Sequence, residues 1–354
     1  MEIPLAKGRG SQINPPNRFG GPWYEVDLDQ LAQDPESHDR LHNQPTEYIP
    51  DNSKTLISEN DSPDIGFRYS INPYRGCSHG CAYCYARPYH EYLGWSAGLD
   101  FETKILVKEK APDLFREFLC RESWRPELIA MSGVTDCYQP AERKFRLTRG
   151  CLEVAAEARQ PMGIVTKNAL VLRDLDILRP MAEANLVRVH ISITTLDAGL
   201  ARTMEPRTST PKARLRAVKE LAEAGVPVRV LIAPIIPGLN EAEIPGILKA
   251  VKEAGAHGAG YTLLRLPLTV APVFQEWLNR TQPTRAQRIE GRVRDTRNGK
   301  LYDSDFKSRM KGTGVIAEQI RDMFLLFARR LGLDKPFPAV DCSQFRPPGQ
   351  MWLF

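Results

Sequence analysis

Short β-rich runs alternate with amphipathic helical stretches between residues 66 and 275, and this alternation constrains the fold more than any other feature. The β-rich runs cover residues 66–71, 128–133, 162–166, 187–194, 228–235 and 260–264. The helical stretches cover residues 111–120, 148–158, 172–184, 211–224 and 242–254. Strands and helices that alternate at this spacing predict βαβ units and a mainly parallel sheet. About six units are too few for a closed eight-stranded barrel, so we expect a partial (β/α)6 barrel of the TIM type.

The segments on either side of this core differ from it in composition. Residues 1–65 are rich in proline, asparagine, glycine and charge, and predict a mostly irregular extension that wraps the core or contacts a partner. Residues 276–354 contain a basic stretch at 280–311, a predicted helix at 315–331 and a proline-rich tail. We therefore divide the chain into an N-terminal extension (1–65), a core barrel (66–275) and a basic helical C-terminal region (276–354).

Composition and charge narrow the class of protein. The 48 basic and 43 acidic residues give a net charge of only +5, so any polyanion site must lie where the positive charge is concentrated. The most apolar run, residues 230–236, is far too short to span a membrane, and the first residues lack the pattern of a secretory signal. We expect a cytoplasmic protein, in which the seven cysteines are thiols, metal ligands or catalysts and not disulfides.

Three cysteines, Cys77, Cys81 and Cys84, follow the first β-rich run with C-x3-C-x2-C spacing. Thiolates on so short a loop are brought together at one site. A structural zinc ion usually takes four ligands from two separated pairs. An iron–sulfur cluster held by three cysteines leaves one iron open for a substrate or cofactor, and the spacing fits this better. The alternatives are three buried thiols, or a zinc knuckle completed by His79 or His90.

This loop resembles the signature of the radical S-adenosylmethionine (SAM) superfamily, C-x3-C-x-aromatic-C, with Tyr83 in the aromatic position. The chain is most similar to the spore photoproduct lyase-like branch, over about residues 70–270. The shared segments are Cys84-Tyr85, Thr166-Lys167, Ser192 within HISITT, Glu205-Pro206-Arg207-Thr208 with Arg214-Leu215, and Ala233-Pro234-Ile235. The resemblance implies a [4Fe-4S] cluster held by the three cysteines, with SAM on the open iron. It also implies an enzyme that cleaves SAM reductively, so that a 5′-deoxyadenosyl radical abstracts hydrogen from the substrate. A flavodoxin or ferredoxin would then donate the electron.

The same resemblance implies further cofactor contacts. Lys167 and Ser192 match the SAM carboxylate contacts of the branch, and a lysine at a strand end can form a charge-assisted hydrogen bond with a carboxylate. Ser132 and Gly133 end the second strand, where the superfamily holds the SAM amino group. Asn240 lies near the expected adenine or ribose.

Two tyrosines and a fourth cysteine complete the predicted site. Tyr83 either contacts adenine through its backbone or packs in the core, whereas Tyr85 matches a tyrosine of the lyase radical relay. Spore photoproduct lyases carry a hydrogen-donor cysteine at about the position of Gly133, so the same lyase activity is not expected here without a substitute. Cys137 is either a displaced donor or a buried thiol. Four polar residues after the second strand are expected either to face the substrate or SAM or to be ordinary solvated loop residues: Asp136, Gln139, Glu142 and Arg143. Glu205 and Arg214 either belong to the site or form a structural ion pair.

The C-terminal region adds two hypotheses about partners. Residues 280–311 contain ten basic and four acidic residues, which suits a phosphate backbone, although few aromatic residues lie among them; a helical cap over the barrel is the alternative. The last five residues, Gln350–Phe354, resemble the peptide by which bacterial DNA-maintenance enzymes dock on the replication sliding clamp. We expect a radical SAM enzyme that repairs or modifies a nucleic acid. The rivals are a radical SAM enzyme for a peptide or small metabolite, and a non-catalytic, metal-containing nucleic-acid binding module.

Overall fold

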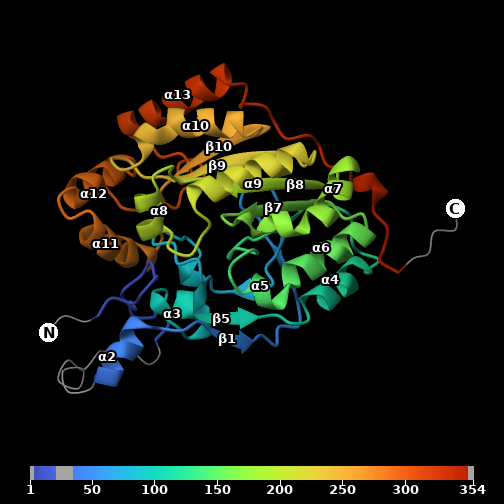
Figure 1. Cartoon of the computed structure of the whole chain (residues 1–354), viewed down its shortest axis with the longest axis horizontal. Coiled ribbons are helices and arrows are strands. Elements are labelled where there is room, and N and C mark those ends of the chain that lie inside the picture. Colours follow the sequence, from blue (N-terminus) through green and yellow to red (C-terminus); the bar gives the residue numbers. More distant parts are fainter. Residues whose placement is uncertain (1–3, 21–34, 350–354) are drawn as a thin grey trace.

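The computed structural model describes residues 4–20 and 35–349, and a seven-stranded sheet forms its centre (Figure 1). The strand order is β10-β9-β8-β7-β6-β3-β2. Six neighbouring strands are parallel: β3 (Tyr69–Ile71), β6 (Ile129–Met131), β7 (Met162–Thr166), β8 (Val187–Ser192), β9 (Val228–Ile235) and β10 (Gly258–Leu263). The edge strand β2 (Ile57–Glu59) pairs antiparallel with β3. The predicted partial barrel and its six parallel strands are confirmed, with shifts of a few residues at their ends.

Alternating burial along the strands explains how the helices cover this sheet. In β8, Val187, Val189 and Ile191 are buried at every second position and join the main apolar core. That core also holds residues of five helices: α4 (Ala111–Leu119), α6 (Leu147–Glu157), α7 (Leu175–Glu183), α9 (Pro211–Glu223) and α10 (Ile244–Glu253). Full burial of one such side chain contributes about 1.5–3 kcal/mol. The five predicted helical stretches are therefore helices because their apolar faces close the core.

A second, three-stranded sheet was not predicted from the sequence. Its order is β1 (Glu47–Pro50), β5 (Lys104–Val107) and β4 (Tyr74–Arg75). These strands have two to four residues, too few for a period-two pattern to be recognised. The sheet matters for the site because β4 ends directly before Cys77. It anchors the start of the cysteine loop beside the main sheet.

The extensions contain more regular structure than expected. Before the core lies α2 (Pro35–His42), and after it come α11 (Val270–Thr281), α12 (Ala286–Asp295) and α13 (Gly314–Arg330). The last of these helices agrees with the predicted helix at 315–331, and its Ile320 and Phe324 complete the main core. The chain then runs back along the outside of the helices: Asp341 N donates to Asn185 O (2.9 Å) and Arg346 N to Ala158 O (2.8 Å).

Most of the basic segment 280–311 is used inside the molecule. Seven of its ten basic residues donate to, or pair with, other residues of the described chain: Arg280, Arg285, Arg292, Arg294, Arg297, Arg309 and Lys311. Arg297 is 1% exposed and donates to the carbonyl of Leu264 at 2.7 Å, and burial lowers its pKa to about 10. Arg285, Arg297, Arg309 and Lys311 bond to residues outside the segment and so tie it to the rest of the molecule.

Two further sequence-based predictions concern the C-terminal peptide and membrane-spanning helices. The predicted clamp-docking peptide, Gln350–Phe354, lies outside the described residues. Within residues 4–20 and 35–349, none of the helices combines the length and the apolar character that a membrane crossing requires.

Candidate cofactor and active site

The cysteine loop runs from the end of β4 to the 3-10 helix η1 (Arg87–Leu93) and is packed so tightly that two glycines are required. Gly80 has φ +68°, and a Cβ there would lie 2.6 Å from the carboxylate of Glu102. On the other side the N-terminal segment passes against the loop, and a Cβ on Gly10 would lie 1.7 Å from the carbonyl oxygen of Gly80. The backbones of residues 10 and 80 therefore touch, which leaves no room for a side chain.

The three thiols of the motif lie close together. Cys77 and Cys81 are buried and Cys84 is half-buried. Burial raises the pKa of Cys81 and of Cys84, and the neighbouring thiols add to both shifts. In a cubic cluster each cysteine binds a different iron, and three cysteines leave one iron open for a cofactor. The donor set therefore fits a [4Fe-4S] cluster.

Neither nearby histidine completes a zinc site. His90 packs against the rings of Trp95 and Phe101, with ring centroids 5.2 and 5.7 Å away. Both of its ring nitrogens are buried without a hydrogen-bond partner, and burial lowers its pKa to about 4. His79 lies beside the thiol of Cys77, but its Nδ1 lies 3.4 Å from the carboxylate of Asp136 and its Nε2 lies 3.1 Å from the amide nitrogen of Asn168. Both ring nitrogens of His79 thus already have partners within the chain.

Asp136 and Gln139 support the cysteine loop through hydrogen bonds and an ion pair. Gln139 is fully buried; its Oε1 accepts from Ser78 N at 3.0 Å, and its Nε2 donates to Gly76 O at 3.1 Å. Asp136 accepts from Lys167 N at 2.8 Å. Although burial opposes both shifts, their mutual attraction raises the pKa of His79 to about 9 and lowers that of Asp136 to about 2. An ion pair thus links the cysteine loop to the end of β7.

The next polar residue along the chain, Glu142, is likewise structural. It is fully buried, pairs with Arg173 at 2.7 Å and accepts from Thr148 N at 3.0 Å. Of the four polar residues expected after the second strand, only Arg143 has an exposed side chain. The alternative that these are solvated loop residues is therefore wrong for the three buried members, Asp136, Gln139 and Glu142.

Lys167 is the unpaired cation of the site. It follows β7 directly, and its Nζ lies 5.8 Å from the centre of the Tyr83 ring. Its positive charge lowers the pKa of the Cys81 and Cys84 thiols and so opposes the upward shift that burial causes. Within residues 4–20 and 35–349, its ammonium group has no hydrogen bond or ion pair. A half-buried ammonium of this kind suits an anionic ligand group, as the expected SAM carboxylate contact requires.

A buried ion pair fixes the aromatic residue of the motif. Glu205 and Arg214 are 2% and 1% exposed and form a direct ion pair. The Glu205 carboxylate also accepts from the hydroxyl of Tyr83, and Arg214 donates to Ser192 O at 3.1 Å. The structural alternative for this pair is therefore confirmed. Through it, the cysteine loop and the end of β8 with Ser192 are held together.

The end of β6 brings Tyr85 and Gly133 together but buries Cys137. The Tyr85 hydroxyl donates to Gly133 O at 2.8 Å. Ser132 adopts a left-handed conformation with φ +82°, and its hydroxyl accepts from Cys137 N at 2.8 Å. Cys137 is 0% exposed and lies in the main apolar core with Met131, and burial raises the pKa of its thiol. Its thiol therefore lies in the apolar core and has no exposed surface.

Asn240 shapes the turn after β9. Its amide nitrogen donates to the carbonyls of Thr194 (2.8 Å) and Pro234 (3.2 Å), and its amide oxygen accepts from Ile236 N at 2.6 Å. Both amide hydrogens are thus used within the turn. Asn240 would therefore influence a bound nucleoside indirectly, by fixing the conformation of this turn.

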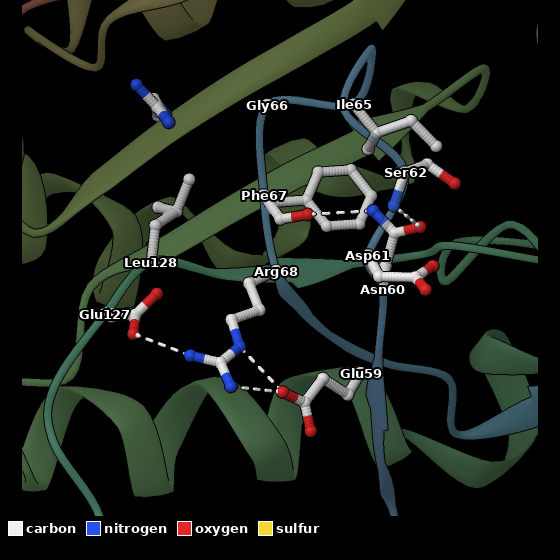
Figure 2. A pocket seen from close by; sticks show the side chains of 11 residues that line it. Glu59, Asn60, Asp61, Ser62, Ile65, Gly66, Phe67, Arg68, Glu127 and Leu128 are labelled. Atoms are coloured by element: carbon white, nitrogen blue, oxygen red, sulfur yellow. Dashed lines mark hydrogen bonds and ion pairs between the residues drawn. The ribbon is translucent and has the colours of Figure 1, made fainter. Parts of the chain in front are cut away.

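A cavity of about 790 Å³ lies at the opposite ends of the strands (Figure 2). It is lined by Arg68, Leu128 and Arg188, which stand at or just before the first residues of β3, β6 and β8. Figure 2 shows Arg68 between the carboxylates of Glu59 and Glu127, with which it forms ion pairs. The cysteine loop and Lys167 follow the carboxyl ends of strands, where barrel active sites lie. This cavity is therefore not the cofactor site.

Comparison with known proteins identifies the family. Residues 71–251 match the family model of the radical SAM superfamily. The chain belongs to the radical SAM superfamily. The cofactors of these enzymes are a [4Fe-4S] cluster and SAM, which the three thiols and the unpaired Lys167 fit.

The relatives with known sequences carry no assigned activity. An uncharacterized protein of Mycobacterium tuberculosis is 38% identical over 221 residues, which cover 62% of this chain and 65% of the relative. An uncharacterized protein of Methanocaldococcus jannaschii is 33% identical over 204 residues, 57% of this chain and 72% of the relative. The chain thus spans just under two thirds of the mycobacterial relative.

Solved structures with a similar fold include spore photoproduct lyases. A spore photoproduct lyase mutant superposes with a TM-score of 0.58 at 17% identity, covering 89% of this chain and 85% of the lyase. A second mutant, solved with bound AdoMet and dinucleoside spore photoproduct, gives 0.55 at 17% identity over 80% of this chain and 78% of the lyase.

Several supporting residues could not be identified from the sequence. Glu102 is fully buried, accepts from Gly10 N and Ser11 N at 3.0 and 2.8 Å, and pairs with Arg87 at 2.5 Å. Arg87 in turn donates to Cys81 O at 2.9 Å. The only signal in the sequence was the glycine at position 10, and nothing indicated which part of the loop it meets.

Proposed function

We propose that this chain abstracts hydrogen from a nucleic acid, in the repair or modification of DNA, by radical SAM chemistry. The observation that carries the proposal is the hydrogen bond of 2.8 Å between the hydroxyl of Tyr85 and the carbonyl of Gly133. It joins the cysteine loop to the strand end where lyases of this branch have their hydrogen donor. In support, a lyase of the same fold binds a dinucleoside spore photoproduct.

The residues of the chain have separate roles in this proposal. Cys77, Cys81 and Cys84 hold the cluster, and the Lys167 ammonium binds the carboxylate of SAM. The backbone of Ser132 lies at the strand end expected for the amino group. When bound, the cluster and SAM supply the radical that abstracts hydrogen.

This chain differs from the lyases in the residues available to donate a hydrogen atom back to the substrate radical. Gly133 has no side chain to donate, and the thiol of Cys137 is buried in the apolar core. The exposed ring of Tyr85 borders the mouth of the barrel and is better placed for a radical-transfer role. We therefore propose related chemistry on a nucleic acid and not the same lyase reaction.

Anaerobic reconstitution tests the proposal. Wild-type protein should bind about four irons per chain and form 5′-deoxyadenosine from SAM, with deuterium transferred from a labelled nucleic acid. Cys81→Ala should abolish both, whereas Cys120→Ala, at an exposed cysteine outside the motif, should abolish neither. If deuterium were transferred only from a peptide or metabolite pool, the proposal that the substrate is a nucleic acid would be rejected.

One observation favours the rival substrate, a peptide or small metabolite. Seven of the ten basic residues of 280–311 are bonded within the chain, so this segment offers few free charges to phosphates. Affinity for a nucleic acid should fall steeply with salt because each phosphate contact releases counterions. Activity that does not change with salt between 50 and 200 mM would favour the rival.

Two partners belong to the same proposal. A flavodoxin or ferredoxin would supply the electron. The tail Gln350–Phe354 would dock on a bacterial sliding clamp, and a chain lacking these five residues should lose measurable clamp binding while it keeps its iron. Equal clamp binding by both proteins would rule out this docking site.

A further inference from the structure

The exposed aromatic side chains of the described residues all lie on one surface. They are Phe19, Tyr85, Tyr89, Tyr92 and Phe306, each between 46% and 69% exposed, and we call them the aromatic surface. The ring of Tyr92 lies 4.8 Å from that of Phe19 and 6.5 Å from that of Tyr89. Single exposed rings are ordinary on a protein surface, but a contiguous group marks a binding site.

Tyr89 connects the two halves of this surface. Desolvation raises the pKa of the Tyr85 hydroxyl to about 12, and Tyr89, four residues further along the chain, makes a smaller contribution to this shift. The hydrogen bond to Asp64 raises the pKa of Arg309, and Tyr89 again adds to the shift. Arg309 itself lies 4.4 Å from the ring centre of Phe306. Tyr89 is therefore close to both Tyr85 and Arg309.

Arginines lie on three of the five rings. Besides Arg309 on Phe306, Arg18 lies 5.1 Å from the centre of Phe19 and Arg265 lies 5.7 Å from the centre of Tyr85. Arg18 is paired with Glu91. Arg309 is paired with Asp64.

Arg265 differs from the other two arginines. Across the part of the chain that the structure describes it has no acidic partner in an ion pair, and its Nε is buried without a hydrogen-bond partner. Asp64 is near enough to interact with its charge but is bonded to Arg309. Of the three arginines, the one without an ion pair thus stands beside Tyr85. It follows that an anionic group of a ligand would be drawn to the end of the surface nearest the cysteine loop.

The chemistry of this surface fits one occupant best. Nucleic-acid bases stack on aromatic faces with about 1–3 kcal/mol per base, and arginine pairs with phosphate. A duplex hides the faces of its bases, so flat rings at the surface can meet only unpaired nucleotides. We propose that the aromatic surface binds the unpaired nucleotides of a nucleic-acid strand and that Arg265 contacts a phosphate beside Tyr85. The proposal rests on the proposed function, which supplies the nucleic-acid substrate.

The surface also has the position that a substrate site needs. Tyr85 follows the cluster ligand Cys84 directly, and Tyr89 and Tyr92 belong to η1, the next element of the chain. A strand stacked along Tyr92 and Tyr89 would thus present its next nucleotide at the mouth of the barrel, next to the cofactor site. The basic segment 280–311 contains few aromatic residues, and most rings of the aromatic surface come instead from the cysteine loop and η1.

Binding of a labelled single-stranded oligothymidylate to the reconstituted holoenzyme tests the proposal. Tyr89→Ala and Tyr92→Ala should each weaken binding about 5- to 150-fold, since 1.4 kcal/mol corresponds to a factor of ten. Tyr89→Phe should restore it because the ring remains. Leu326→Ala, at a 46% exposed residue of α13, is the matched control and should have no effect. Iron content and SAM binding should be unchanged in all four variants.

The contact of Arg265 has its own measurement. Arg265→Gln should weaken binding and reduce the slope of log affinity against log salt by about one, whereas Arg321→Gln, at an exposed arginine, should leave the slope unchanged. Equal slopes for wild type and Arg265→Gln would remove this phosphate contact from the proposal.

Other outcomes overturn the proposal and separate it from the proposed function. If wild type binds the oligonucleotide and the alanine variants bind it equally well, the aromatic surface is refuted while the nucleic-acid substrate stands. The proposal would also be refuted if the protein bound a duplex more tightly than the single strand, or if a peptide bound to the aromatic surface more tightly than the oligonucleotide. Binding of the oligonucleotide only after removal of residues 21–34 would refute it as well. If wild type binds no nucleic acid and transfers no deuterium from it, the proposed function itself fails.

Discussion

The buried pair of Glu205 and Arg214 gives the sharpest test of how the site is held together. Glu205→Gln removes the charge but keeps the size of the side chain, and leaves the guanidinium of Arg214, 1% exposed, without a counter-charge. Removal of one partner from such a pair costs about 3–5 kcal/mol. The variant should therefore lose this amount of unfolding free energy.

Urea denaturation of the metal-free protein, followed by circular dichroism, measures the effect. With an m-value of about 3 kcal/mol/M, the midpoint should fall by about 1 M or more. The control is Glu220→Gln, which breaks an exposed pair with Arg216 and should cost no more than about 0.5 kcal/mol. Equal midpoints for the two variants would refute the reasoning.

The pH dependence provides a second check on the same pair. Although burial opposes it, Arg214 lowers the pKa of Glu205 in the folded protein. A lowered pKa means that the stabilisation is fully present above the unfolded value of about 4.3 and is lost as the pH falls through the folded value. The stability difference between wild type and Glu205→Gln should therefore shrink only below about pH 4.

Two further predictions concern the cofactor site. Lys167→Ala removes the unpaired ammonium and should weaken SAM binding by about 10- to 100-fold in equilibrium dialysis, because a hydrogen bond to a charged group contributes about 1.5–3 kcal/mol. The control is Lys212→Ala, at an exposed lysine, which should leave SAM binding unchanged. Equal SAM affinities of the Lys167→Ala variant and wild type would exclude the contact. Gly10→Ala forces its Cβ against Gly80 O and should expose the N-terminal segment to limited proteolysis, whereas Gly66→Ala, with nothing within 4 Å, should leave it protected. Equal protection in the two glycine variants would contradict the packing.

The parts of this molecule that follow from local pattern were predictable. Four of the six parallel strands, β7 to β10, have five to eight residues, and the helix at 314–330 has seventeen, so their apolar pattern appears in the sequence. The three-residue strands β3 and β6 were predicted from longer β-rich runs at 66–71 and 128–133. The cysteine spacing indicated the cofactor because three thiols on one short loop are rare outside metal sites. In each of these cases the information lies within a single stretch of chain.

The parts that depend on distant pairing were not predictable. Asp136 and Gln139 resemble loop residues in the sequence, yet they support the cysteine loop because β6 ends beside it. The basic segment suggested a polyanion site, but Arg309 reaches Asp64, 245 residues away, and is neutralised there. Tyr92 and Phe19 are likewise far apart in the chain and meet only in the folded protein.

The contact between Gly10 and Gly80 also sets an order of events during synthesis. The N-terminal segment leaves the ribosome first, but its anchor, Glu102, is made 92 residues after Gly10. The segment can therefore dock only after the whole cysteine loop has emerged. Until then the outer side of the loop, which Gly10 covers in the folded protein, is uncovered.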